Sequence, residues 1–177
     1  MAQSLFREKG YAATSMRDLA ETLGIEAASL YNHIASKEEI LQQICFSMAD
    51  AFFAAFEAAN DPSLPARERL RNVTEAHLGV IAANNDASAV FLYEWRHMGE
   101  PFLSDFKLMR RRYEALFRSI IEQGIHAGEF RALEPGVATK TLLSATNWTY
   151  ESYTSARSSS ESIASEIARI ILEGIIQ

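Results

Sequence analysis

The chain has 177 residues, of which 48% are hydrophobic and 23% charged, and its formal net charge at pH 7 is -6. This ordinary globular composition suffices for one domain with a good core, or for a small domain and a larger one. No apolar run approaches the roughly 20 residues of a membrane-spanning helix, and the charged residues within 1–10 argue against a signal peptide. The single cysteine excludes an internal disulfide and a cysteine-rich metal site. We therefore expect a cytoplasmic protein that contacts no membrane.

Helical periodicity runs through nearly the whole chain, while signals for β-strands are scarce. Glycine, proline and asparagine mark the breaks between helical segments. The lone Cys45 falls on an apolar helix face and is expected in the core. The sequence therefore predicts an all-α fold. After a short first helix within residues 2–13, the predicted helices cover 16–23, 26–33, 36–59, 66–83, 87–98, 102–127, 135–154 and 161–176.

The stretch from Ser15 to Glu39 carries clear signals for helix ends. Ser15 stands at a helix N-cap position, and Asp18 can complete a capping box with it. Gly24 follows the last apolar residue of that helix, as a C′ glycine does. Ser36 and Glu39 repeat the capping-box spacing. Two short helices joined by a tight turn, followed by a longer helix, are therefore predicted here.

The second short helix has an unusual surface. Ile25 is expected to re-enter the core, and Leu30 and Ile34 share an inward face. A helix exposed only for solubility would more often carry Lys and Glu on its other side. Together with the glycine turn, a bare outer face is typical of a helix-turn-helix, although an ordinary helical corner is an alternative. The residues left outside are Ala27, Ala28, Ser29, Tyr31 and Asn32.

A set of residues in the first 38 positions matches one known pattern. They are Phe6, Gly10-Tyr11, Ser15, Arg17, Leu19-Ala20, Gly24-Ile25, Leu30-Tyr31, His33 and Ser36-Lys37-Glu38. With them the stretch resembles the DNA-binding domain of TetR-type transcriptional repressors. The resemblance implies a three-helix, helix-turn-helix head over 1–38 and a helical ligand-binding and dimerisation body over 39–177.

The same resemblance implies which residues contact double-stranded DNA. Ala27 and Ala28 would face base edges, where their methyl groups can touch thymine methyls, and Asn32 shares this surface. For His33, a hydrogen-bonded packing role is the alternative. A two-fold dimer would place its recognition helices roughly 34–36 Å apart, which implies a near-palindromic operator. The implied phosphate contacts are Ser15, Arg17, Ser29, Tyr31, His33 and Lys37.

The charge of the head argues mildly against nucleic acid. Residues 1–39 hold four cations and six anions, so the basic footprint of most DNA-binding domains is missing. Helix N-termini and a few well-placed contacts can still hold phosphate, and we expect modest affinity. The first helix is also shorter than that of TetR-type heads, and a late start codon or a trimmed chain would explain this.

Two aromatic-dense segments, 91–98 and 147–153, carry interleaved polar groups, and three consecutive arginines occupy 110–112. Core packing and a solvated face are the alternatives to a ligand site. Glu-Trp-Arg at 94–96, Gly-Glu-Phe-Arg at 128–131 and Asn-Trp-Thr-Tyr-Glu at 147–151 resemble repressors of acyl-CoA catabolism. That branch implies an acyl-CoA thioester as effector, although Ser152 departs from it where a second Trp is common. The predicted effector residues are Phe91, Trp95, Arg96, Arg112, Tyr113, Asn147, Trp148 and Tyr150.

The last predicted helix has a broad apolar stripe, which favours homodimerisation over packing within one subunit. Catalysis has little support, because the four histidines are scattered and no phosphate loop or nucleophile elbow occurs. We expect no enzyme activity, metal or cofactor. A drug-efflux repressor and a helical ligand-binding protein without DNA binding remain alternatives. The predicted dimer residues are Tyr153, Ile163, Ile167, Ile170 and Ile171.

Overall fold

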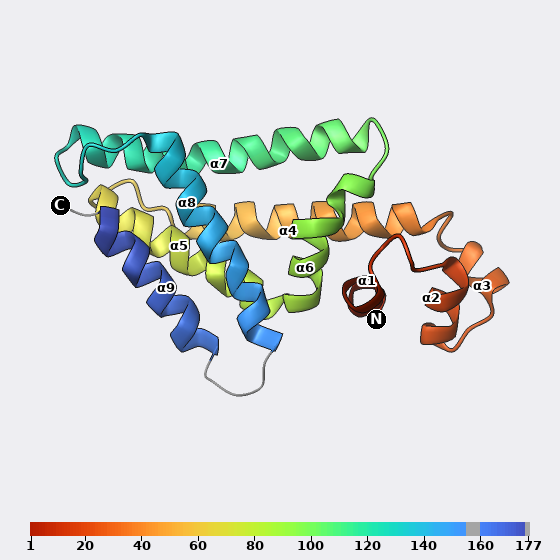
Figure 1. Cartoon of the computed structure of the whole chain (residues 1–177). Helices are drawn as coiled ribbons and strands as arrows, with labels where there is room; N and C mark the ends of the chain where they lie inside the picture. Colours follow the sequence, from red (N-terminus) through yellow and green to blue (C-terminus); the bar gives the residue numbers. More distant parts are fainter. Residues whose placement is uncertain (155–159, 176–177) are drawn as a thin grey trace. The chain divides into compact units, whose positions relative to one another are not determined.

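The computed structural model describes the backbone of residues 1–154 and 160–175, and the side chains of 1–151 and 166–175. Within these ranges the chain is helical and contains no β-strand, which confirms the all-α prediction (Figure 1). The elements are α1 (Ala2–Lys9), α2 (Met16–Leu23), α3 (Ala27–Tyr31), α4 (Lys37–Ala59), α5 (Ala66–Ala83), α6 (Asn85–Tyr93), η1 (Glu94–His97), α7 (Phe102–His126), α8 (Pro135–Trp148), η2 (Thr149–Thr154) and α9 (Ser160–Ile175).

The chain divides into two compact units. The first, called the head unit here, comprises Met1–Asp50 and Asp86–Leu108, and the second, the body unit, comprises Ala51–Asn85 and Met109–Gln177. Helices α4 and α7 each contribute residues to both. The predicted division after residue 38 is neither confirmed nor contradicted by these units and stays a prediction.

Helix α4 shows how closely apolar spacing determined the core. The apolar residues that recur at helical spacing along it are buried, and Cys45 among them is a core residue as expected. Two other predicted helices end early: a 3₁₀ segment, η1, replaces the end of 87–98, and η2 replaces the end of 135–154. The buried α4 residues are Ile40, Leu41, Ile44, Cys45, Met48, Phe52 and Phe56.

The expectation that Ile25 re-enters the core is wrong, because its side chain is 41% exposed. Gly24 adopts a left-handed conformation with φ of 67°, and the Ile25 amide donates to the carbonyl of Ala20 at 3.0 Å. This Schellman-type closure fixes the backbone of the turn. Leu23 of the same turn is also exposed, so the turn is held by its backbone bonds rather than by apolar contacts.

The body unit is held by an apolar core that includes Phe117, Ile121, Phe130 and Leu142, all buried. A Cβ on Gly124 would lie 2.3 Å from the Phe130 ring, so only glycine permits this approach of α7 to the following turn. The turn also serves α5. The Glu129 carboxylate accepts the amides of Ala66 and Arg67 at 3.2 and 3.0 Å and thereby caps the first turn of that helix.

Candidate DNA-binding face and effector residues

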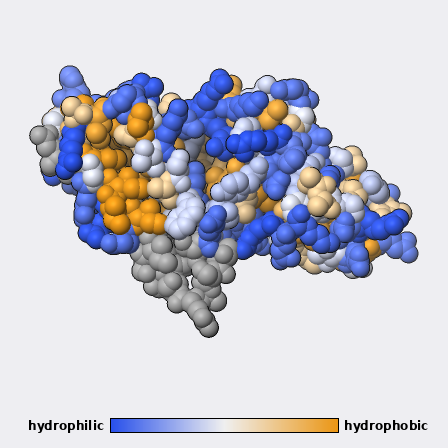
Figure 2. All heavy atoms as spheres, in the orientation of Figure 1, coloured by the Kyte–Doolittle hydropathy of each residue, from blue (hydrophilic) through white to orange (hydrophobic). Residues whose placement is uncertain are grey.

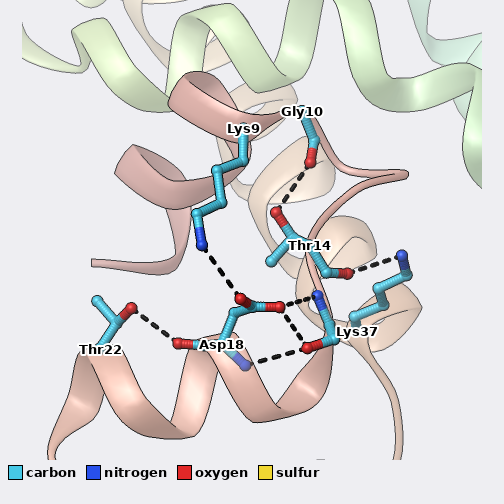
Figure 3. Close-up of polar contacts among 7 residues, drawn as sticks. Lys9, Gly10, Thr14, Asp18, Thr22 and Lys37 are labelled. Carbon is cyan, nitrogen blue, oxygen red and sulfur yellow. Dashed lines mark hydrogen bonds and ion pairs between the residues drawn. The ribbon is translucent and has the colours of Figure 1, made fainter.

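Helix α2 is anchored at its start by a complete capping box (Figure 3). The Ser15 hydroxyl oxygen accepts the Asp18 amide at 3.1 Å, and the Asp18 carboxylate accepts the Ser15 amide at 2.8 Å and the Ser15 hydroxyl. Lys9 adds an ion pair to Asp18 at 3.1 Å. These bonds from Ser15 and Lys9 hold the pKa of Asp18 well below its ordinary value. The Ser15 hydroxyl, a predicted phosphate contact, is therefore also part of the helix cap.

Helix α3 presents the predicted reading face to the surface. Leu30 is buried and Ile34 half-buried, as their spacing predicted. The Tyr31 side chain is 55% exposed and Ala27 is half-buried. No charged side chain stands on this helix, so its backbone can come close to a partner. The remaining predicted contacts on or beside α3 are exposed: Ala28, Ser29, Asn32 and His33.

A shallow groove of about 420 Å³ runs beside Tyr31. It is lined by residues 12–16 at the start of α2 and by residues 35–37 at the start of α4. The Ser36 hydroxyl oxygen accepts the Glu39 amide at 3.2 Å, and the Glu39 carboxylate accepts the Ala35 amide at 2.9 Å. The groove therefore combines two helix N-termini, which favour anions.

Lys37, which the helix-turn-helix pattern predicts as a phosphate contact, binds backbone carbonyls of the head instead. Its ammonium donates to the carbonyls of Tyr11, Ala12 and Thr14 at 2.9, 3.3 and 2.9 Å, and lies 4.4 Å from the centre of the Tyr11 ring. Figure 3 shows the bond to Thr14. Since an ammonium has three N–H donors, Lys37 is committed to the backbone of the head. Arg17, in contrast, is exposed on α2.

The predicted effector residues fall into both units. Phe91, Trp95 and Arg96 belong to the head unit, and the other five belong to the body unit. The rings of Phe91 and Trp95 pack against Phe106 with centroids 5.3 and 5.8 Å apart. The Arg96 guanidinium lies 4.6 Å from the centre of the Trp95 ring, a cation–π arrangement. These three residues thus form one aromatic and cationic cluster.

In the body unit, Tyr113 and Asn147 meet at a residue that the sequence analysis did not select. His77 on α5 lies 3.1 Å from the Tyr113 hydroxyl through Nδ1 and 3.1 Å from the side-chain amide oxygen of Asn147, Oδ1, through Nε2. Because that oxygen only accepts, Nε2 carries the hydrogen and Nδ1 accepts the hydroxyl of Tyr113. The ring also stacks on Phe52 with centroids 4.7 Å apart.

Burial determines the protonation of this cluster. It lowers the pKa of His77 to about 4 and raises the pKa of Tyr113, so both groups are neutral at pH 7. The signal that the sequence analysis overlooked is the position of His77 on the buried face of α5. It follows Leu70, Val73 and Thr74 at helical spacing.

The remaining effector predictions lie nearer the surface of the body unit. Arg112 is exposed, whereas its neighbour Arg110 is half-buried, so the inward arginine of the triplet is Arg110. The Trp148 side chain is 52% exposed. Tyr150 is half-buried and its hydroxyl donates to Glu151 at 3.0 Å. Of the five, Tyr113 and Asn147 are brought together at His77.

Helix α9 carries an exposed apolar surface (Figure 2). The Ile170 side chain is 58% exposed, and Ile167 and Ile171 are half-buried. The predicted dimer residues Tyr153 and Ile163 lie outside the described side chains. On α8, the uncharged residues Val137, Thr141, Ser144 and Trp148 form an exposed stripe, and the exposed Lys140 lies along its edge.

Other kinds of site are not evident in the described part of the chain. No three His, Cys, Asp or Glu side chains are grouped there as a metal site would need. None of its helices combines the length and hydrophobicity of a bilayer-crossing segment.

Family models match both parts of the sequence. Residues 1–44 match the model for bacterial regulatory proteins of the tetR family, and residues 63–175 match the tetracyclin repressor-like C-terminal domain. The second match alone covers well over half of the chain. The chain belongs to the TetR family. The resemblance inferred from the head motif is confirmed.

Several TetR-family relatives are similar over most of this chain. The HTH-type transcriptional repressor KstR2 of Mycobacterium tuberculosis is 29% identical over 132 residues, 74% of this chain and 66% of the relative. Its solved structure superimposes with a TM-score of 0.92, at 25% identity, and covers 99% of this chain and 91% of that one. The matched region therefore spans just under two thirds of the relative's sequence.

Two further solved structures share the fold. PfmR, a TetR-family transcriptional regulator from Thermus thermophilus, has a TM-score of 0.85 and 33% identity, and the match covers 99% of this chain and 94% of PfmR. AibR, solved in complex with isovaleryl coenzyme A and operator DNA, has a TM-score of 0.84 at 22% identity, with 96% and 92% covered. At that identity the likeness to AibR shows the fold alone.

Proposed function

We propose that this protein is a homodimeric transcriptional repressor that binds a near-palindromic operator and releases it on binding an acyl-CoA thioester. The observation that carries the proposal is the exposed, uncharged face of α3, mounted on capped helices beside a groove with two helix N-termini. The family membership adds to it, because bacterial regulators of this kind share such a head.

The DNA contacts follow from what the head leaves available. Ala27 and Ala28 are small enough for the helix to approach base edges, while Ser29, Tyr31 and His33 reach phosphates. Among the cations of residues 1–39, Arg7 pairs with Asp86, Lys9 with Asp18, and Lys37 with backbone carbonyls. Arg17 is the cation best placed for phosphate. Affinity then depends on helix N-termini and neutral donors, and its dependence on salt is shallow.

The effector class is supported by the aromatic and cationic clusters and by relatives. Arg96 above Trp95 suits an anionic group next to an apolar one, as in a thioester of a phosphorylated carrier. AibR was solved with isovaleryl coenzyme A and operator DNA, and a fatty acid metabolism regulator of Bacillus subtilis is 22% identical. The thioester would favour a conformation whose heads no longer match successive major grooves.

Dimerisation would use a second copy packed on α8 and α9. The uncharged stripe of α8 and the exposed Ile170 of α9 support this choice. Residues Tyr153, Ile163, Ile167 and Ile171 are proposed to join the same interface.

The deciding experiment is a gel shift with the DNA upstream of the protein's own gene, with and without a panel of acyl-CoA thioesters. Binding that at least one thioester abolishes supports the proposal, whereas binding retained at saturating concentrations of all of them rejects the release step. Absence of any salt-dependent DNA binding would favour a helical ligand-binding protein instead. Thermal stabilisation by hydrophobic cations but not by thioesters would favour a drug-efflux repressor.

A further inference from the structure

The buried imidazole of His77 holds the side-chain amide of Asn147 in one orientation. The His77 side chain is only 3% exposed, and its Nε2–H donates to Oδ1 of Asn147 at 3.1 Å. A side-chain amide has an acceptor oxygen at one end and an NH2 donor at the other. Because the imidazole engages the oxygen, the amide cannot turn around without losing this hydrogen bond.

The imidazole is itself held in place by its neighbours. Its Nδ1 accepts the Tyr113 hydroxyl at 3.1 Å, and its ring stacks on Phe52 with centroids 4.7 Å apart and 26° between the planes. The Phe117 ring meets it edge to face, with centroids 6.2 Å apart. If the hydrogen moved to Nδ1, the Tyr113 hydroxyl would need another acceptor, and no described residue provides one. Leaving that buried hydroxyl unpaired would be costly, so the hydrogen stays on Nε2.

The NH2 group of Asn147 is available to a ligand. Asn147 stands in the last turn of α8 and is half-buried. Its Nδ2 atom is accessible to solvent and has no hydrogen-bond partner among the described residues. The amide therefore directs its donor end away from His77 while its oxygen is fixed. A fixed donor beside an aromatic cluster suits a ligand that combines an apolar part with an acceptor oxygen.

We propose that Asn147 donates a hydrogen bond to the acyl carbonyl of the effector and that His77 is a positioning residue that keeps this donor turned outward. The inference rests on the proposed function as an acyl-CoA-responsive repressor and adds the atom that recognises the acyl group. The carbonyl oxygen of a thioester accepts such a bond, whereas a hydrophobic cation has no acceptor to offer. The site thereby favours acyl compounds over the cations that a drug-efflux repressor would bind.

The orientation of the amide is tested first without effector, by 15N NMR of the full-length protein labelled at histidine. The variant His77→Gln identifies the His77 signals by their loss, and His126→Gln is the matched control, which keeps them. At pH 7 we expect the His77 hydrogen on Nε2 and none on Nδ1. A hydrogen on Nδ1 would mean that the NH2 group of Asn147 faces His77 and its oxygen faces outward, which would overturn the inference.

The carbonyl contact is tested by calorimetry with isovaleryl, phenylacetyl and palmitoyl coenzyme A, each beside its S-alkyl thioether. The thioether keeps the coenzyme and the alkyl chain but lacks the carbonyl oxygen. For at least one pair, wild type should bind the thioester about fivefold more tightly. Asn147→Asp keeps an acceptor for His77 but has no NH2 group, so this preference should disappear. In the control Asn84→Asp, exposed at the end of α5, the preference should remain.

The role of His77 is tested in the same assay by His77→Phe, which keeps a ring against Phe52 but cannot bond Asn147. The preference for the thioester should fall while thioether binding is retained, and an unchanged preference would overturn the positioning role. Equal binding of thioester and thioether by wild type, or a preference that persists in Asn147→Asp, would overturn the carbonyl contact and leave an acyl-CoA effector in place. Failure of wild type to bind any thioester rejects the proposed effector class, and the carbonyl contact with it.

Discussion

The buried imidazole of His77 should make the stability of this protein depend on pH. The folded pKa of about 4 lies below the ordinary value of 6.5 that the unfolded chain would show. Below pH 6.5 the His77 imidazole is therefore protonated in the unfolded state but stays neutral in the folded state. As a result, the free energy of unfolding falls as the pH is lowered toward 4. From these two pKa values, the loss between pH 8 and pH 5.5 is on the order of 1 kcal/mol.

The matched variant is His77→Gln, which is neutral throughout this range. Urea denaturation of both proteins, followed by far-ultraviolet circular dichroism at one fixed protein concentration, gives the free energy of unfolding at each pH. The difference between wild type and variant should shrink by an amount on the order of 1 kcal/mol on going from pH 8 to pH 5.5. The exposed histidines His33, His97 and His126 are present in both proteins and cancel in this difference.

A second variant, His126→Gln, shows how the result can refute the reasoning. It removes an exposed imidazole at the end of α7 and is the matched control for the loss of a histidine that lies outside the core. If wild type and His77→Gln run parallel from pH 8 to pH 5.5, His77 accepts a proton in the folded state as readily as in the unfolded one. The assignment of a neutral, Nε2-protonated imidazole bound to Tyr113 and Asn147 would then be wrong.

Four further substitutions have definite expected outcomes. Arg17→Ala should reduce the slope of log affinity against log salt by about one per head, measured by fluorescence anisotropy with operator DNA. Lys37→Met should lower the free energy of unfolding by about 1–3 kcal/mol, because three carbonyls lose a charged donor. Gly124→Ala should also lower the free energy of unfolding. Overpacking against Phe130 costs about 1–3 kcal/mol, whereas the gain in helix propensity is at most about 1 kcal/mol. A smaller residue at position 130 should recover part of the lost stability. Ile170→Asp should shift sedimentation toward the monomer, and an unchanged dimer would place the interface elsewhere.

Local signals in the sequence were sufficient for most of the fold. The capping box of Ser15 and Asp18, the left-handed Gly24 and the apolar spacing of α4 each depend on neighbours a few residues apart. Such short-range patterns determine where helices begin and end. They could not show that α6 gives way to a 3₁₀ segment at Glu94, nor that the Ile25 side chain is left outside by the backbone closure around Gly24.

The functional residues were predicted less completely, because their roles depend on partners far apart in the sequence. His77 was seen as one of four scattered histidines, and its bonds to Tyr113 and Asn147 span 36 and 70 positions. Lys37 was selected for DNA because of the pattern around it, yet its ammonium binds carbonyls 23 to 26 positions earlier. A sequence pattern shows which residue types are present at which spacing. Only the structure shows which atoms their side chains bind.

The acidic head is explained by where the charges of residues 1–39 are directed. Lys9 and Lys37 satisfy groups of the head itself, Arg7 fastens α1 to Asp86, and Glu38 fastens Gly99. Charges used in this way raise the specificity of the head's internal arrangement and leave little for phosphates, so we expect a modest affinity for the proposed operator. If the operator affinity is modest, a small difference in effector affinity between the DNA-binding and the released conformation is enough to abolish operator binding. A head built from such contacts would gain operator affinity from added surface lysines, and it would then need more effector binding energy for release.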